Sequence, residues 1–488
     1  MNKLLLHSLY VIKITFITII SIGSSYAEDG VENAMVNNSQ LSFSRIVMET
    51  KTINEGEYFD FIRSSIIEQP EFLYANSNYN EKSESLKFAK RQRWPELSTR
   101  IINDHVLERD VSEQNSLRKR QDDSFDAAIE LSQPIYSGGT INAQIRKSIS
   151  DKNLSEVERE NALSLLILDA NRIYLNAVKS YTMFNHADKI VKEIEPYLNK
   201  VKERVNLGIS DPIELALFSI KYNSLKSKFQ ILKTEMNRDI GIFEYFFGKE
   251  FNSVYFPNIF VPQIEMDKNN EAYEVKASKL NFEGSKEDTN LVKGEFRPKF
   301  GFNTRYTIYD LDEDENDTDI RGGIFFSMPI FTFGRSTAKI SASKAKENAL
   351  RMSIDVERKN DDVAENEVVN LVKSAFNTRG DIINSLNDTK NQRRIIKNRL
   401  DSTNFSPESF VTSSIEEIDL LSQALSIEMN MLHGYFTFLH QNQSLTSHLR
   451  IKLWMKVEKN KPWASIGFGV LYYKIKGLMF KLHLPLFL

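Results

Sequence analysis

The stretch QPIYSGG at residues 133–139 returns as MPIFTFG at residues 328–334. The proline, the isoleucine, the next aromatic residue and the final glycine match at a constant offset, and the patterns on both sides agree as well. Self-similarity at a fixed spacing is typical of a repeated structural unit. We therefore expect two halves with the same order of elements, residues 57–270 and residues 271–455.

Each stretch closes a segment with the pattern of a β-hairpin. Alternate residues from Phe300 to Ile308 are apolar or aromatic apart from Thr304, so they share one face of a strand. The returning run 320–331 is nearly all apolar. In the first half, residues 124–131 alternate clearly and residues 96–106 are more polar. The sequence predicts two strands in each half.

Helical stretches that end at a proline precede the hairpins, over residues 84–95 and 271–298. Charged runs, residues 108–123 and 310–319, join the two strands of each half, as expected of solvated loops. Carboxylates of the second run are suitable calcium ligands, but the run lacks the central glycine and spacing of an EF-hand.

A long helix is expected after each stretch. Residues 140–207 contain no glycine, and apolar residues recur every seven positions from Ala170 to Val205. This heptad pattern predicts a coiled-coil seam in a helix of about 100 Å. Pro196 interrupts the run and predicts a kink or a local break.

The tip of this helix carries turn signals. Gly208 suits a left-handed cap, Ser210 or Asp211 can cap the next helix, and Pro212 suits its first turn. The chain then returns over residues 214–247. The second half predicts the same hairpin, with a helix from 335 to about 400, a turn between 401 and 417, and a return over 418–449.

Four strands per chain cannot close into a barrel, and an open sheet edge in a membrane leaves backbone groups without partners. Three chains would give about 12 strands, within the range of outer-membrane barrels. The expected fold class is therefore a membrane β-barrel joined to a long α-helical barrel, closed as a trimer. The barrel-to-tunnel junction is expected at Pro134, Gly138, Gly139, Pro329 and Gly334.

The first residues predict export. Lys3, an apolar run from Val11 to Ile22 and the small residues before Glu28 form a signal peptide over residues 1–27. The alternative is an uncleaved anchor, although the run is shorter than the about 20 residues of a spanning helix. Residues 28–56 would be a linker.

Composition narrows the class of protein further. The chain has no cysteine, hence no disulfide framework and no lipid-bearing cysteine. Its net charge of −3 argues against nucleic acid. The apolar and aromatic tail 456–488, with interleaved lysines, would either lie on a membrane surface or be a disordered extension.

The two stretches resemble those of TolC-like outer-membrane efflux proteins, and RVNLGISDPIEL at residues 204–215 resembles the tip turn of that family. The resemblance covers about residues 57–455. It implies a homotrimer in the cell outer membrane, in contact with lipid, with a helical tunnel in the periplasm. It also implies passive export in tripartite efflux or type I secretion, with a periplasmic adaptor and an inner-membrane pump of the ABC or RND type.

The family closes its periplasmic end with a ring of acidic residues. The resemblance places such aperture residues at Glu214 and Asp419, with Glu416 and Glu417 close by. The alternative is that these acids only favour a helix start, where negative charge suits the dipole.

The sequence contains no G-x-S-x-G motif, no cysteine nucleophile, no P-loop and no metal-ligand spacing such as H-E-x-x-H, so we expect no enzyme and no cofactor. A rival interpretation is a periplasmic or surface coiled-coil interaction protein without a channel, which would explain the heptads but not the aromatic strand 300–308.

Overall fold

The computed structural model describes residues 52–105, 107, 123–252, 255–264, 271–311, 317–399 and 407–451. The predicted signal peptide (1–27), most of the predicted linker (28–56) and the tail (456–488) lie outside these ranges. The chain divides into two compact units, residues 1–446 and 447–488, and all elements except the end of α9 (Leu445–His448) belong to the first. Among the described helices, none combines the length and the hydropathy needed to cross a bilayer.

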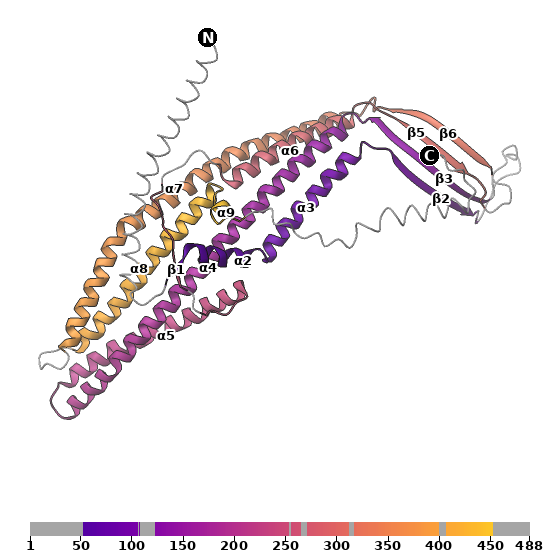
Figure 1. Ribbon diagram of the computed structural model, residues 1–488. Helices are drawn as coiled ribbons and strands as arrows, with labels where there is room; N and C mark the ends of the chain where they lie inside the picture. Colours follow the sequence, from indigo (N-terminus) through magenta and orange to yellow (C-terminus); the bar gives the residue numbers. More distant parts are fainter. Residues whose placement is uncertain are drawn as a thin grey trace, which may run out of the picture. The chain divides into compact units, whose positions relative to one another are not determined.

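The two halves have the same order of elements (Figure 1). The first half contains α3 (Pro70–Arg91), β2 (Glu96–His105), β3 (Asp123–Tyr136), α4 (Thr140–Asn206) and α5 (Pro212–Phe247). The second half contains α6 (Tyr273–Glu295), β5 (Lys299–Ile308), β6 (Thr318–Ser327), α7 (Arg335–Asn398) and α8 (Pro407–Gln441).

Several boundaries differ from the sequence expectation. α3 begins at Pro70 rather than at residue 84, and α8 begins at Pro407 rather than at residue 418. Both helices have proline in the first turn, where its missing N–H costs no hydrogen bond. The short β1 (Thr52–Asn54), α2 (Glu55–Ile66) and β4 (Phe256–Asn258) were not expected; β1 and β4 pair in parallel.

The two predicted hairpins join into one antiparallel sheet with the order β2-β3-β5-β6. The link between the halves is the β3–β5 pairing, in which Ile129 faces Tyr306 and Leu131 faces Thr304. β3 continues through Tyr136 across a β-bulge, whereas the edge strand β6 ends at Ser327, before Pro329. Proline cannot donate to a ladder, so a strand end at this point is expected.

The long helices pair as hairpins, α4 with α5 and α7 with α8, and the two hairpins also contact each other. In Figure 1 they extend from one end of the sheet. α4 is continuous through the exposed Pro196, so of the two expected alternatives, a kink or a local break, the break does not occur. Ala170 and Ala177 of the predicted seam are fully buried, and so is Ile194 further along α4. Towards the tip, one apolar core joins all four helices and includes Ile194, Phe218, Leu386 and Phe410.

Candidate functional site

The sheet has one apolar face and one charged face. The strand register brings apolar residues of all four strands onto the same face, among them Leu97, Ile101, Ile129, Phe302, Ile324 and Phe326. Ile324 is 79% exposed and Leu97 is 69% exposed. Exposed apolar side chains in such number mark a surface that meets another apolar phase.

The opposite face carries most of the charged residues of the sheet, including Glu96, Arg100, Glu130, Arg305, Asp319 and Arg321. Arg305 and Glu130 form an ion pair across β5 and β3, with 3.1 Å between Nη2 and Oε2. Ile102 and Phe325 are apolar exceptions on this face, and Phe325 packs over Gly301. Alternation of apolar and charged residues along every strand gives the sheet two chemically different sides.

Among the described residues, both edges of the sheet are open. Within these ranges β2 pairs with β3 alone, and β6 pairs with β5 alone. The two edges differ in sequence and belong to different halves. Each therefore presents unpaired backbone donors and acceptors to its surroundings.

At the junction the two halves use the same backbone geometry. Gly139 and Gly334 precede α4 and α7 with φ of 88° and 82°, a conformation that favours glycine. The Ser137 and Thr332 carbonyls accept from the amides of Thr140 (3.3 Å) and Arg335 (3.0 Å). Pro134 lies inside β3, whereas Pro329 follows β6.

The junctions differ in their surroundings. A β-carbon on Gly138 would overlap the carbonyl oxygen of Gly294, because the end of α6 packs against this loop. A β-carbon on Gly334 would meet no atom of the described residues within 4 Å. The first junction is therefore packed within the chain, and the second is open.

The tip turn has the expected cap. Gly208 has a φ of 71°, and the amides of Ile209 and Ser210 donate to the Arg204 carbonyl. The Asp211 side chain accepts from the amide of Ile213 at 2.8 Å, and Pro212 begins α5. Asp211, rather than Ser210, is thus the N-cap.

The four acidic candidates at the tip occupy different environments. Glu214 lies in the first turn of α5, where the helix dipole favours a negative charge. Glu416 and Asp419 are exposed on α8, well past its first turn, so the dipole does not account for them. Asp419 pairs with Lys228 of α5. Lys228 lies about 21 Å along α5 from Glu214, so the structure does not bring Glu214 and Asp419 together.

Glu417 differs from the other three because its side chain is only 3% exposed. It meets His186 of α4 at 3.0 Å and Arg393 of α7 at 3.3 Å. Arg393 also donates to Ser414 at 2.9 Å and pairs with Glu193 of α4. Lys397 of α7 also pairs with Glu193. We call His186, Glu193, Arg393, Lys397 and Glu417 the ionic cluster; it ties α4 to the α7–α8 hairpin.

Burial alone raises the pKa of Glu417, but the His186 contact and the Arg393 charge outweigh it and hold the pKa below its usual value. Glu428, also on α8, shows the opposite balance: burial raises its pKa despite the pairing with Arg379. The cluster therefore keeps Glu417 ionised at neutral pH as a structural contact between helices. Sequence patterns could not reveal this, because the partners lie on three separate helices.

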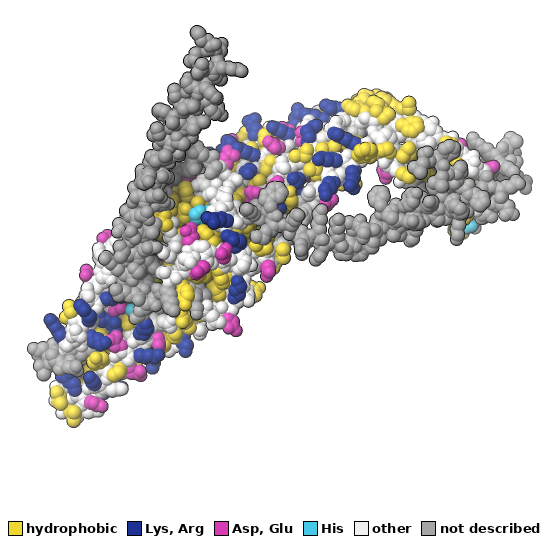
Figure 2. Space-filling view, viewed as in Figure 1, with side chains coloured by type: hydrophobic (Ala, Val, Ile, Leu, Met, Phe, Trp, Pro, Cys, Tyr) yellow, Lys and Arg dark blue, Asp and Glu magenta, His cyan; other side chains and the backbone are white. Residues whose placement is uncertain are grey.

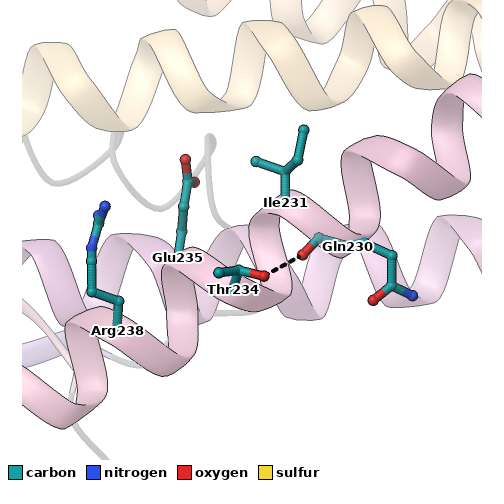
Figure 3. A pocket seen from close by; sticks show the side chains of 5 residues that line it. All are labelled: Gln230, Ile231, Thr234, Glu235 and Arg238. Atoms are coloured by element: carbon teal, nitrogen blue, oxygen red, sulfur yellow. Dashed lines mark hydrogen bonds between the residues drawn. The ribbon is translucent and has the colours of Figure 1, made fainter.

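A shallow hollow of about 310 Å³ lies on α5, lined by Gln230, Ile231, Thr234, Glu235 and Arg238 (Figure 3). Ile231, Glu235 and Arg238 point to the same side of the helix, while the Thr234 hydroxyl donates to the Gln230 carbonyl at 3.0 Å. All the lining residues come from one helix, so the hollow has no opposing group to orient a ligand. In the described ranges no cluster of acids and histidines could hold a metal ion.

This architecture is that of outer membrane channels of known structure. The chain superposes on the CmeC outer membrane channel of Campylobacter jejuni with a TM-score of 0.68 and 14% identity, over 79% of this chain and 85% of that one. It superposes on the outer membrane protein VceC of Vibrio cholerae with a TM-score of 0.62 and 12% identity, over 78% and 96%. It superposes on the open state of the MtrE outer membrane channel of Neisseria gonorrhoeae with a TM-score of 0.64 and 11% identity, over 79% of this chain and 89% of that one.

The family model described as outer membrane efflux protein matches residues 62–217. Together with the fold, this match confirms the resemblance to TolC-like outer-membrane efflux proteins. No curated protein sequence matches the chain.

Proposed function

We propose that this chain is one third of a trimeric exit duct in the cell outer membrane, serving tripartite efflux or type I secretion. The observation that carries the proposal is the sheet, which has an exposed apolar face, a charged face and two open edges. A bilayer suits the first face, a water-filled lumen suits the second, and neighbouring chains would pair the edges.

The need for other chains follows from backbone hydrogen bonding. Each unpaired backbone group in hydrocarbon costs several kcal/mol, so β2 and β6 cannot remain open in a membrane. Pairing β6 of one chain with β2 of the next closes a ring. With three chains this ring has about 12 strands, within the range of outer-membrane barrels.

The helices support the same assembly. Ile213, Leu217 and Ile220 of α5 are exposed at helical spacing, as are Met352 and Val356 of α7. Such stripes lie against other helices in coiled coils. In the proposed trimer, neighbouring chains cover part of them, and the helices form a tunnel in the periplasm.

The proposal includes partners that act on the helical end. A passive duct needs an inner-membrane pump, of the ABC or RND type, and a periplasmic adaptor that joins the two. The solved channels that share the fold are outer membrane channels by name, and this chain spans 85% or more of the three described above. The family model that matches residues 62–217 is described as outer membrane efflux protein.

We further propose that Asp419 and Glu416 form an acidic ring in the trimer, with Glu214 as a second acidic level nearer the tip. Three copies of exposed carboxylates favour cations and repel anions. Breaking the Asp419–Lys228 pair would free the α8 carboxylate and loosen α8 from α5. Glu417 is assigned to the structural contact and not to the ring.

Fractionation and gel mobility test the duct against its rival. The duct predicts an outer-membrane location, a trimer that dissociates on heating, and ion conductance in planar bilayers. A soluble monomer without conductance would favour the coiled-coil interaction protein.

Single-channel recording tests the ring. We expect Asp419→Ala to alter conductance and to reduce cation selectivity, because it removes three charges from the trimer. Asp188→Ala is the matched control, since Asp188 is also ion-paired, with Lys192 on α4, but lies outside the proposed ring. Unchanged conductance and selectivity in Asp419→Ala would contradict the ring.

A further inference from the structure

The junction between sheet and helices combines exposed aromatic residues with unpaired cations. One end of the sheet, along the direction of its strands, holds the last residues of β3 and β6 and the first residues of β2 and β5. The register shows this, because Tyr136 pairs with Phe300 and Lys299 with Ser327. Every crossing between sheet and helix therefore occurs at this level. Figure 2 shows hydrophobic side chains gathered there, next to Lys and Arg side chains of the adjoining helices.

The apolar part of this level is strongly exposed. Trp94 is 73% exposed, Phe333 is 87% exposed and Ile330 is 93% exposed. We call the group the apolar collar; it comprises Trp94, Ile135, Tyr136, Ile330, Phe331 and Phe333. Aromatic residues of this kind are enriched where a membrane protein meets the headgroup region.

A basic collar lies on the helical side of the apolar collar. It consists of Lys90, Arg91, Arg93, Arg297 and Arg335, all exposed. Within the described ranges, none of the five forms an ion pair. Arg93 is held at the junction by neutral contacts: its Nη2 donates to Asn142 of α4 at 2.7 Å, and its carbonyl accepts from Gln133 of β3 at 3.0 Å.

The nearby acids do not neutralise this collar. Glu295 pairs with Lys339 at 2.5 Å. Glu96 belongs to the charged face of the sheet by its register. Unpaired guanidinium groups beside an exposed aromatic belt match the phosphate groups of lipid headgroups in charge and in hydrogen-bonding geometry.

We propose that the basic collar selects anionic phospholipid headgroups in the leaflet that faces the helices. The inference rests on the membrane-embedded duct proposed above and adds the class of lipid that surrounds its helical end. Each Lys or Arg near an anionic surface contributes about 1 kcal/mol, equivalent to about a fivefold preference. Several collar residues per chain would therefore produce a marked preference for anionic lipid.

Trp94 provides a reporter inside the collar itself. The chain has three tryptophans, so Trp454→Phe and Trp463→Phe leave Trp94 as the sole tryptophan, which is excited selectively over tyrosine. The full-length protein is reconstituted in phosphatidylcholine vesicles that contain brominated phosphatidylglycerol or brominated phosphatidylcholine. Quenching of Trp94 then measures the relative affinity of the two lipids at this level.

We expect brominated phosphatidylglycerol to quench Trp94 more strongly than brominated phosphatidylcholine. Arg91→Gln, Arg93→Gln and Arg297→Gln should each lower the preference about fivefold. Lys299→Gln is the matched control, because it removes one positive charge at the same level but on the charged face of the sheet. The preference of Lys299→Gln for phosphatidylglycerol over phosphatidylcholine should equal that of the parent protein.

The outcomes separate the two proposals. Equal quenching by both lipids overturns the headgroup selection and leaves the membrane duct standing. A preference that Lys299→Gln lowers as much as Arg297→Gln also overturns it, because the selection would then be a general charge effect. No quenching by either lipid places Trp94 out of reach of the lipid and overturns the headgroup selection, while fractionation and conductance still decide the duct.

Discussion

At the scale of single residues, local turn chemistry was visible in the sequence and long-range contacts were not. The glycines at positions 139, 208 and 334 precede or follow proline-marked turns and adopt positive φ. The contact between Gly138 and Gly294 joins two halves of the chain, so no local pattern could reveal it. The same holds for the partners of Glu417, which come from α4 and α7.

The two junction glycines allow a matched test. Both have positive φ, so alanine costs about 1–2 kcal/mol at either position. Gly138→Ala must in addition displace the Gly294 carbonyl, which adds about 1–3 kcal/mol for overpacking. We expect Gly138→Ala to lower the thermal unfolding midpoint clearly more than Gly334→Ala does. Circular dichroism of the protein in detergent measures both midpoints. Equal shifts would contradict the packed first junction.

The ionic cluster makes stability depend on pH. Because the pKa of Glu417 is lower in the folded chain than its ordinary value of 4.5, its contribution is complete above about pH 4.5 and is lost as pH falls through the lower folded pKa. Glu417→Gln should reduce stability at neutral pH by about 1–3 kcal/mol, since Arg393 loses one buried partner and keeps Glu193. It should also flatten the loss of stability on acidification.

Denaturation midpoints of the parent and of Glu417→Gln, measured from pH 7 down to the pH at which the parent unfolds, test this pH dependence. Glu416→Gln is the control, because Glu416 is the exposed neighbour of Glu417, and its substitution should change stability by less than about 0.5 kcal/mol. An unchanged acid sensitivity in Glu417→Gln would assign the effect to other carboxylates.

At the scale of elements, long periodic segments were predicted well and short or exposed ones were not. The glycine-free heptad run of α4 matches the helix to within a residue. The three-residue strands β1 and β4 are too short to show alternation. All ten residues of β2 are exposed, which explains its weak pattern: neither face is buried within the chain.

Replacing either of two helix prolines by alanine should change stability, with opposite signs. Pro196 lies inside α4, where it removes a hydrogen bond and crowds the preceding turn, so Pro196→Ala should stabilise the helix by up to about 3 kcal/mol. Pro212 lies at the first turn of α5, where its fixed φ limits the unfolded chain, so Pro212→Ala should cost about 0.4–1 kcal/mol. Thermal midpoints of the two variants should therefore move apart. A destabilising Pro196→Ala would show that the surrounding packing requires proline.

At the scale of the whole molecule, the four strands of the sheet β2-β3-β5-β6 were predictable and their order was not. Each hairpin has its own sequence signature, but the β3–β5 pairing that joins the hairpins depends on rows of apolar residues from both halves. The register matters because a slip of one residue would exchange the apolar and charged faces. Because the two hairpins already form one sheet, the edges of β2 and β6 are those that a neighbouring chain would pair in the proposed barrel.

The two faces of the sheet can be tested at nearly the same depth. Ile324 lies on the apolar face and Asn303 lies next to it on the charged face. A lysine facing lipid near the midplane costs about 2–4 kcal/mol, three times per trimer. We expect Ile324→Lys to reduce the amount of heat-modifiable trimer in outer-membrane fractions strongly, and Asn303→Lys to leave it near the parent level. Similar yields for both variants would contradict a lipid-facing apolar side.

The unequal edges of the sheet have a genetic consequence. In the proposed ring, β6 of one chain meets β2 of the next, so each subunit joins its neighbours through two different surfaces. A subunit with an intact β2 and a spoiled β6 would still enter the assembly and then prevent its closure. Alleles that damage one edge should therefore be dominant over the wild type when co-expressed, whereas alleles that spoil both edges should be recessive.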